Sequence, residues 1–278
     1  MLPAWRLVYA LRRLWRRARV SPVATSTLGP QYVRSRDLIE IDITYLCNLS
    51  CLNCNRSVKQ ARDSQSMPVA MVTAFVVDSM EKGKRWRRIR VLGGEPTLHP
   101  EFHDVIDVLL GYRAFAPDCI VEVVTNGHGP KVQAALERLP DEVWVENSRK
   151  VGDVQPMFRP FSAAPIDDPS HRGADFSNGC AIIRDCGMGL SPGGYYPCAV
   201  AAGIDRVAGI GLGQSALPDE DDDMLEALQE LCSLCGRFKD GHRLPDALRE
   251  PLTHEVVSPT WRKLYGDYRE RRRKGQRS

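Results

Sequence analysis

Residues 38–54 read LIEIDITYLCNLSCLNC and combine two patterns that together decide the fold. The first part, LIEIDI, alternates apolar and acidic residues, which predicts a β-strand over residues 38–43. The second part places Cys47, Cys51 and Cys54 in the spacing C-x3-C-x2-C. Thiols at this spacing can surround one metal centre from a single loop, directly after the strand.

Three thiolate ligands suit one kind of metal centre in particular. Four thiolates saturate the irons of a [4Fe–4S] cluster. Three leave one iron open, as the ligands of a catalytic zinc leave one position open. An open iron can bind a substrate or a cofactor. The alternatives are a zinc site and three incidental core cysteines.

Strand and helix patterns alternate after this loop. The predicted strands cover residues 88–92, 120–124 and 142–146, and the predicted helices cover residues 69–82, 101–112 and 130–138. This alternation predicts an α/β fold built from parallel βαβ units. In such sheets the chemistry gathers at the carboxyl ends of the strands.

Polar motifs stand at the ends of the predicted strands. In the stretch GGEP after the second strand, two glycines let the backbone approach a ligand closely, and a carboxylate can pair with an ammonium group. The stretch TNG follows the third strand, and its asparagine can hydrogen-bond a hydroxyl group. The candidate ligand-binding residues are Gly93, Gly94, Glu95, Pro96, Thr125, Asn126, Ser148 and Arg149.

The cysteine spacing, GGEP and TNG together resemble the radical S-adenosylmethionine (SAM) superfamily. This resemblance implies a partial (β/α) barrel and a catalytic [4Fe–4S] cluster held by the three cysteines, with SAM bound at the open iron. It implies that GGEP holds the amino group of SAM and that TNG lies near the ribose. Ser148 and Arg149 are placed to reach the ribose or the methionine carboxylate. The residue before the third cysteine is often aromatic in the family, whereas here it is Asn53.

A second set of cysteines occupies the C-terminal half. The set comprises Cys180, Cys186, Cys198, Cys232 and Cys235. It resembles the SPASM extension or its shortened form, the twitch domain, and no later cysteine supplies a second auxiliary cluster. The shortened form implies one auxiliary [4Fe–4S] cluster on Cys186, Cys198, Cys232 and Cys235, with Cys180 as a fifth candidate. A structural zinc site is the competing interpretation.

Three further residues are assigned no chemistry. Cys119, at the third predicted strand, is most simply a buried core thiol. His99 and His103 are spaced as metal ligands on a helix can be, but no HExxH pattern accompanies them. Both histidines are therefore predicted to face solvent.

The chain divides into four predicted segments. They are a basic amphipathic N-terminal segment (1–36), the radical SAM core (37–178), a small cysteine-rich extension (179–240), and a C-terminal helix with a basic tail (241–278). Residues 21–30 and 152–179 are rich in Ser, Pro, Gly or Asp and are predicted to be irregular. Helices are predicted near residues 222–232, after an acidic run, and near residues 259–270.

The charge distribution argues against a nucleic-acid-binding core. The chain of 278 residues has a net charge of +3. Residues 1–20 contain six arginines and no acidic residue, and residues 262–278 contain eight Lys and Arg against two acidic residues. The basic character therefore lies in the two ends.

The first stretch, MLPAWRLVYALRRLWRRARV, has apolar residues at helical spacing with arginines close by. Its apolar run is too short and too interrupted for a secretory signal, and no apolar run in the chain is long enough to span a membrane. Two interpretations are open: weak contact with a membrane surface, and packing on the protein's own surface, which is slightly preferred. Clustered cysteines without a signal peptide favour a cytoplasmic metalloprotein.

The resemblance also implies the reaction. Reductive cleavage of SAM gives a 5′-deoxyadenosyl radical that abstracts hydrogen from a small-molecule substrate, with a flavodoxin or ferredoxin as electron donor. A single auxiliary cluster in a short chain favours oxidation of a small polar, sugar-like metabolite. The alternative within the class is modification of a ribosomally made peptide. An alternative of another class is a non-catalytic zinc protein with nucleic-acid-binding tails.

Overall fold

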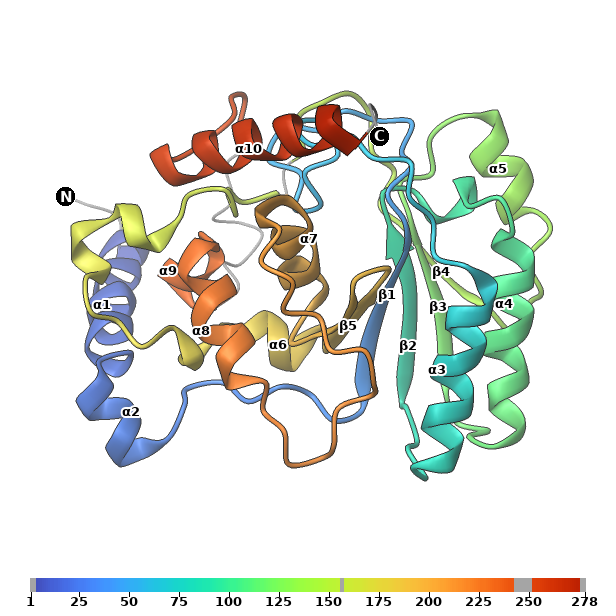
Figure 1. Ribbon diagram of the computed structural model, residues 1–278, viewed down its shortest axis with the longest axis horizontal. Coiled ribbons are helices and arrows are strands. Elements are labelled where there is room, and N and C mark those ends of the chain that lie inside the picture. Colours follow the sequence, from blue (N-terminus) through green and yellow to red (C-terminus); the bar gives the residue numbers. More distant parts are fainter. Residues whose placement is uncertain (1–3, 156–157, 243–251, 276–278) are drawn as a thin grey trace.

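A six-stranded sheet forms the centre of the computed structural model, which describes residues 4–155, 158–242 and 252–275 (Figure 1). Its strand order is β4-β3-β2-β1-β5-β6. The strands are β1 (Leu38–Thr44), β2 (Arg88–Gly93), β3 (Ile120–Thr125), β4 (Trp144–Asn147), β5 (Met188–Ser191) and β6 (Gly194–Tyr196). All neighbours pair in parallel except β5 and β6. The predicted α/β class is confirmed, and the sheet is consistent with a partial (β/α) barrel.

Strand β1 lies at the middle of the sheet and is buried along its whole length. Ile41 pairs with Val91 of β2 on one side and with Leu190 of β5 on the other. The acidic residues of the alternating pattern do not face open solvent, because Glu40 and Asp42 are 5% and 0% exposed. The acidic face of β1 therefore turns toward the functional site.

Helices lie on both sides of this sheet. The helices α3 (Val69–Glu81), α4 (Phe102–Gly111) and α5 (Pro130–Leu136) lie on one side, at the right of Figure 1. They agree with the predicted helices to within a few residues. Their apolar residues, among them Val72 and Leu109, are fully buried, so this layer rests on the apolar side of the sheet.

The cysteine-rich segment packs on the other side of the sheet. It contains α6 (Ala181–Asp185), α7 (Ala199–Ala208), α8 (Leu225–Leu234) and α9 (Arg237–Asp240), which lie to the left of the sheet in Figure 1. Its two strands, β5 and β6, extend the central sheet. The predicted boundary between residues 178 and 179 therefore separates two parts of one continuous sheet.

The segments predicted to be irregular behave differently from each other. Residues 158–179 contain only the short 3-10 turns η3 (Pro165–Asp167), η4 (Pro169–His171) and η5 (Phe176–Asn178), close to the prediction. Residues 21–30 instead contain helix α2 (Pro22–Leu28). Ser21 caps this helix by accepting a hydrogen bond from the Ala24 amide at 3.3 Å, with proline at the first position. Both features are helix start signals that a loop-rich composition conceals.

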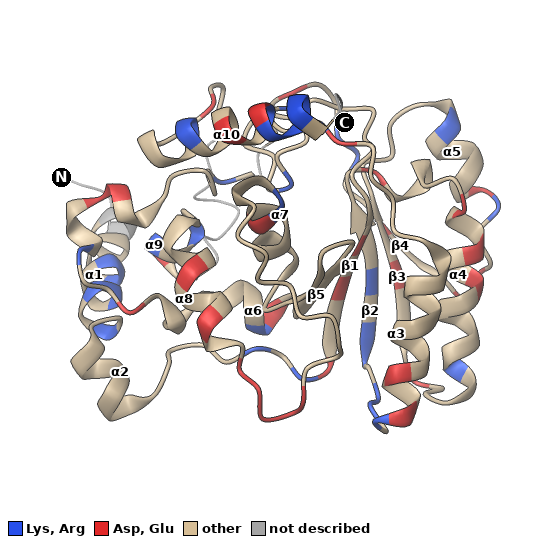
Figure 2. Cartoon of the chain, in the orientation of Figure 1, with Lys and Arg blue, Asp and Glu red and all other residues tan. Residues whose placement is uncertain are grey.

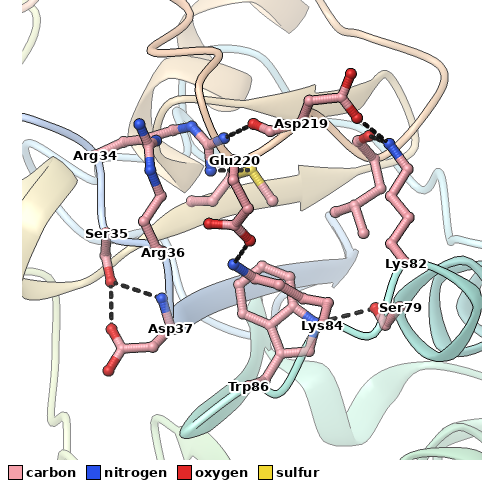
Figure 3. Close-up of polar contacts among 12 residues, drawn as sticks. Arg34, Ser35, Arg36, Asp37, Ser79, Lys82, Lys84, Trp86, Asp219 and Glu220 are labelled. Carbon is pink, nitrogen blue, oxygen red and sulfur yellow. Dashed lines mark hydrogen bonds and ion pairs between the residues drawn. The ribbon is translucent and has the colours of Figure 1, made fainter.

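The acidic run before α8 is tied to the core by cations. Figure 3 shows Arg34, which donates to the backbone carbonyl of Asp219 at 2.6 Å, and Lys82, which reaches the Asp219 carboxylate at 2.6 Å. Lys84 pairs with Glu220 in the same view. These contacts join the loop before α8 to the segment after α3.

The C-terminal helix α10 (Pro259–Gly275) crosses the top of the molecule in Figure 1 and packs through Trp261, Tyr265 and Tyr268, all buried. The Tyr265 hydroxyl lies 3.1 Å from the hydroxyl of Ser57, beside the first cysteine loop. At the opposite end of the chain, helix α1 (Ala4–Arg19) confirms the predicted N-terminal helix. None of the helices in the described part of the chain is long and apolar enough to cross a membrane.

Candidate active site at the carboxyl ends of the strands

The first three cysteines face one cavity at the carboxyl ends of β1, β2 and β3. Cys47, Cys51 and Cys54 all line this cavity, whose volume is about 370 Å³. We call it the chamber. Of the candidate ligand-binding residues, the chamber is also lined by Gly93, Gly94, Thr125, Asn126 and Ser148. The fold therefore brings the cysteine loop and three of the strand-end motifs to one place.

Two residues with positive φ turn the cysteine loop. Asn53 has φ 55° and Ser57 has φ 52°. The Asn53 amide donates to the carbonyl of His254 at 3.0 Å and accepts from the amide of Val256 at 3.0 Å. The Asn53 side chain therefore fastens the C-terminal segment to the loop and does not line the chamber. This use explains why an amide stands where an aromatic ring was expected.

A buried ion pair fixes the same loop to β1. Arg56 binds Asp42 through both carboxylate oxygens at 3.0 Å, and Glu40 lies 3.5 Å away. Burial alone would lower the pKa of Arg56, but the two carboxylates outweigh it and the pKa is raised. Arg56 is therefore charged, and the acidic face of β1 serves to hold the cysteine loop in place.

Amide donors surround the sulfurs of this loop. The Leu49 amide lies 3.5 Å from Cys47 Sγ, and the Asn126 side-chain amide lies 3.9 Å from the same sulfur. Gln155 Nε2 lies 3.6 Å from Cys51 Sγ. Such donors stabilise negative charge on sulfur and tune a bound cluster. Gln155 was not predicted, because it comes from a segment that shows no motif.

Burial affects the state of these thiols without a metal. It raises the pKa of Cys47 to about 11, and it also raises the pKa of Cys51. Metal ligation requires the thiolate, so iron binding at this loop must displace protons. Within the described residues, no three His, Cys, Asp or Glu side chains converge closely enough to hold a single metal ion. A [4Fe–4S] cluster differs from a single ion, because each thiolate binds its own iron.

The glycines of GGEP allow the end of β2 to lie against the cysteine loop. Gly93 has φ 140°, and a Cβ there would come within 2.2 Å of the Thr44 carbonyl oxygen. A Cβ on Gly94 would come within 2.3 Å of the Leu46 carbonyl oxygen. Only glycine fits at these positions, so the backbone of β2 forms one wall of the chamber beside the loop.

Glu95 of the GGEP stretch makes contacts within the protein that the sequence did not predict. Its side chain is fully buried and does not line the chamber. The carboxylate accepts hydrogen bonds from the Thr97 hydroxyl at 2.7 Å, the Thr125 hydroxyl at 2.8 Å and the Asn126 amide at 2.7 Å. These donors engage both carboxylate oxygens, so Glu95 ties GGEP to TNG; its contact with the amino group of SAM stays a prediction. Pro96, also buried, begins the 3-10 turn η1 (Pro96–Leu98) and lies outside the chamber lining.

The two candidate ligand-binding residues after β4 lie in different surroundings. Ser148 lines the chamber and donates from its hydroxyl to the Thr125 carbonyl at 2.7 Å. Arg149, with φ 44°, is exposed and does not line the chamber. The next residue, Lys150, does line it, with its ammonium group 4.8 Å from the centre of the Phe158 ring. The cation at this edge of the chamber is therefore Lys150 and not the predicted Arg149.

His99 also differs from the sequence prediction. It is 4% exposed, its Nδ1 accepts from the Glu101 amide at 3.0 Å, and its Nε2 donates to the Met67 carbonyl at 2.8 Å. One ring nitrogen bonds the backbone at the start of α4 and the other bonds the backbone just before α3, so the prediction that His99 faces solvent is wrong. His103 is half-buried.

Four cysteines of the second set face a second, smaller cavity next to the chamber. They are Cys180, Cys198, Cys232 and Cys235. All four are buried, and burial raises the pKa of each thiol. Neighbouring thiols of the set raise the pKa further at Cys198, Cys232 and Cys235. Cys180 and Arg237 line both cavities. Ile182 and Val200 also line both, so the two cavities adjoin at these four residues.

The grouping of the second set differs from the expected one at a single cysteine. Cys186 is half-buried and lines the chamber instead of the second cavity. It follows α6, whereas Cys180 occupies the N-cap position before that helix. Of these two cysteines, only Cys180 also lines the second cavity, and spacing along the chain does not reveal this.

Charged groups line the rest of the chamber. Arg90 pairs with Glu40 at 2.5 Å and with Glu146, and Arg159 pairs with Asp240. His242 turns Nδ1 to the carbonyl of Asp240 at 2.5 Å, so that nitrogen donates. Its other nitrogen, Nε2, is buried and has no hydrogen-bond partner among the described residues. The chamber lining thus includes paired charges, and His242 beside them carries a buried nitrogen with no partner among the described residues.

Comparison with known protein families supports the resemblance that the cysteine spacing suggested. Residues 41–148 match the family described as "Radical SAM superfamily". The match begins within β1 and ends at Ser148, so it includes the first cysteine loop and all three strand-end motifs. The second cysteine set lies outside it.

One known protein is similar to this chain in sequence, and one solved structure is similar in fold. A GTP 3′,8-cyclase from Chlorobaculum tepidum is 29% identical over 100 residues, which are 36% of this chain and 28% of that protein. This chain therefore matches less than a third of that relative's length. A solved structure, "Crystal structure of BtrN in complex with AdoMet and 2-DOIA", covers 80% of this chain and 100% of its own, with 12% identity and a TM-score of 0.41.

Proposed function

We propose that this chain, whose residues 41–148 match the radical SAM superfamily, is an enzyme that cleaves SAM reductively and oxidises a small polar metabolite. One observation carries the proposal: a single polar chamber is lined both by the C-x3-C-x2-C thiols and by Cys180 of the second thiol group. A substrate in that chamber would lie between two metal-binding sets.

The residues of the chamber fit the groups that this chemistry requires. Cys47, Cys51 and Cys54 would hold a [4Fe–4S] cluster with one open iron. The backbone of Gly93 and Gly94 lies within the chamber wall and can approach SAM without a Cβ in the way. Asn126 and Ser148 offer polar groups to the ribose, and Lys150 offers a cation to the methionine carboxylate.

The second thiol group fits an auxiliary [4Fe–4S] cluster. We assign its ligands as Cys180, Cys198, Cys232 and Cys235, because these four share a cavity. When bound, the clusters and SAM would supply a 5′-deoxyadenosyl radical that removes a hydrogen atom, and an acceptor for the electron left on the substrate. A flavodoxin or ferredoxin is the electron donor that this chemistry requires.

The chain's own residues would handle the substrate and its proton. The paired charges of Arg90 and Arg159 give the chamber walls fixed donors for a polyhydroxylated molecule. His242 lines the same chamber, and its Nδ1 donation to Asp240 leaves Nε2, which is buried and has no hydrogen-bond partner among the described residues, as an acceptor. It can accept the hydroxyl proton that an alcohol loses on oxidation.

Anaerobic purification with iron and sulfide analysis tests the proposal. We expect about eight irons per chain and release of 5′-deoxyadenosine from SAM after dithionite reduction. A variant with all three loop cysteines changed to alanine should keep about half of the iron. It should release no 5′-deoxyadenosine. Cys119→Ala is the control, because Cys119 is a cysteine that lies outside both cavities.

Two results would contradict parts of the proposal. Zinc alone, with no SAM cleavage after cluster reconstitution, would overturn the radical enzyme and favour a zinc protein. A precursor peptide that binds tightly would overturn the metabolite as substrate while leaving the radical chemistry intact.

A further inference from the structure

Helix α1 is attached to the rest of the protein through its polar side. Arg16 is 1% exposed, donates to the Phe238 carbonyl at 3.2 Å, and holds its guanidinium carbon 4.4 Å from the centre of the Phe238 ring. Tyr9 donates from its hydroxyl to the Asp240 carboxylate at 2.5 Å. The inward face of this helix is therefore made of hydrogen-bonding groups.

The apolar side of α1 faces outward. Its large apolar side chains are 50–62% exposed: Leu7, Val8, Leu11, Leu14 and Trp15. At about 100° per residue, these five fall within a sector of about 120°, and Tyr9 and Arg16 lie on the opposite side. We call them the α1 stripe. An ordinary surface helix buries such a stripe against the core, so α1 has the reverse orientation.

Arginines border the stripe on both edges. Arg12 and Arg17 are exposed and make no hydrogen bond or ion pair within the described part of the chain. Figure 2 shows the basic residues of α1 at the left edge of the molecule, away from the sheet. Residues 1–20 contain no acidic residue that could neutralise them.

We propose that α1 docks this protein on an anionic phospholipid surface. The α1 stripe would enter the boundary between headgroups and acyl chains, and Arg12 and Arg17 would bind the phosphates. Charge decides between this occupant and a second copy of the chain. A stripe-to-stripe dimer would oppose two arginine-rich helices without any acidic partner, whereas an anionic membrane supplies both the apolar phase and the counter-charge.

Co-sedimentation with vesicles tests this docking. The holoenzyme should bind vesicles that contain phosphatidylglycerol and should bind pure phosphatidylcholine vesicles at least about tenfold more weakly, and added salt should weaken binding. Leu11→Glu/Leu14→Glu should reduce binding to the anionic vesicles by at least about tenfold. Val77→Glu/Met80→Glu on α3 is the matched control, since these residues have the same spacing and are 44% and 45% exposed.

Three results would overturn the docking surface. They are absence of binding to the anionic vesicles, equal binding to neutral vesicles, and a dimer in light scattering that Leu11→Glu/Leu14→Glu dissociates. Iron content and SAM cleavage of the same variants are measured in parallel. Normal values there separate a failure of docking from a failure of the proposed function, on which this inference does not depend.

Discussion

The carboxylate of Glu95 accepts a hydrogen bond of 2.7 Å from the backbone amide of Asn126, and this contact joins the ends of β2 and β3. The same carboxylate binds the hydroxyl of Thr125 at 2.8 Å. One buried anion therefore sets the distance between two walls of the chamber. Its oxygens accept hydrogen bonds from backbone and hydroxyl donors of the protein itself, and we propose that Glu95 acts as a positioning residue.

Glu95→Gln should destabilise the protein. The new amide group would present N–H atoms to at least one of the donors that the carboxylate now accepts, and a buried polar group left unsatisfied costs about 1–3 kcal/mol. Thermal and denaturant unfolding measure this loss. Glu101→Gln, at an exposed position before α4, is the control. Equal stability of the two variants would contradict the role given to Glu95.

Cys180→Ser and Cys186→Ser should differ in iron content. Cys180 shares the second cavity with three other thiols, whereas Cys186 faces the chamber. We therefore expect Cys180→Ser to lose about half of the iron and Cys186→Ser to keep it all. Iron and sulfide analysis of anaerobically purified protein gives the answer, and the reverse pattern would restore the ligand set expected from the sequence.

Sequence patterns predicted the sheet and the first cysteine loop because both depend on local order. Alternation marks a strand over LIEIDI, and three ligands on one loop need no long-range contact. The strands β5 and β6 were missed because each is short and Gly-rich and is formed by pairing with β1 or with its neighbour. Their place in the sheet is a tertiary effect.

The site was harder to predict where the direction of a side chain decides its role. GGEP was recognised by its glycines, but the inward turn of Glu95 depends on donors that lie 30 residues later in the chain. Lys150 lines the chamber and its neighbour Arg149 does not. The positive φ of Arg149 turns the chain at this point. Composition and spacing contain no information on such a turn.

Lys150→Ala should weaken SAM binding by about tenfold, equivalent to about 1.4 kcal/mol. Lys150 lines the chamber close enough to Cys51 to lower that thiol's pKa, and it is the cation that we assign to the methionine carboxylate. Equilibrium binding of SAM to the anaerobic holoenzyme measures the change. Arg149→Ala serves as control and should bind SAM normally. A larger loss for Arg149→Ala would return the role to the residue predicted from the sequence.

Cys119 should resist alkylation up to high pH. Burial raises the pKa of this thiol to about 11 from an ordinary value of 9.0, so the thiol stays neutral in the folded protein. Its contribution to stability is complete below about pH 9 and is lost as the pH rises through about 11. Mass-spectrometric mapping of iodoacetamide labelling between pH 7 and pH 11 follows the Cys119 peptide. Rapid labelling at pH 8 would contradict its burial.

Arg16 links the N-terminal helix to the second thiol group. It is buried against Phe238, and its charge lies close enough to Cys180 and Cys232 to interact with both. Burial lowers its pKa to about 10, so Arg16 remains a cation at neutral pH and should favour electron addition to a cluster on these thiols.

Arg16→Met should therefore lower the reduction potential of the auxiliary cluster. The free energy of reduction should become less favourable by an amount on the order of 1 kcal/mol. A redox titration followed by electron paramagnetic resonance measures this potential. Arg17→Met removes a neighbouring charge that is exposed, and solvent should screen its effect. If both variants have the potential of the unchanged protein, Arg16 serves only to anchor α1. If Arg16→Met alone shifts it, the helix that carries the α1 stripe also sets the electrostatics of the second thiol group.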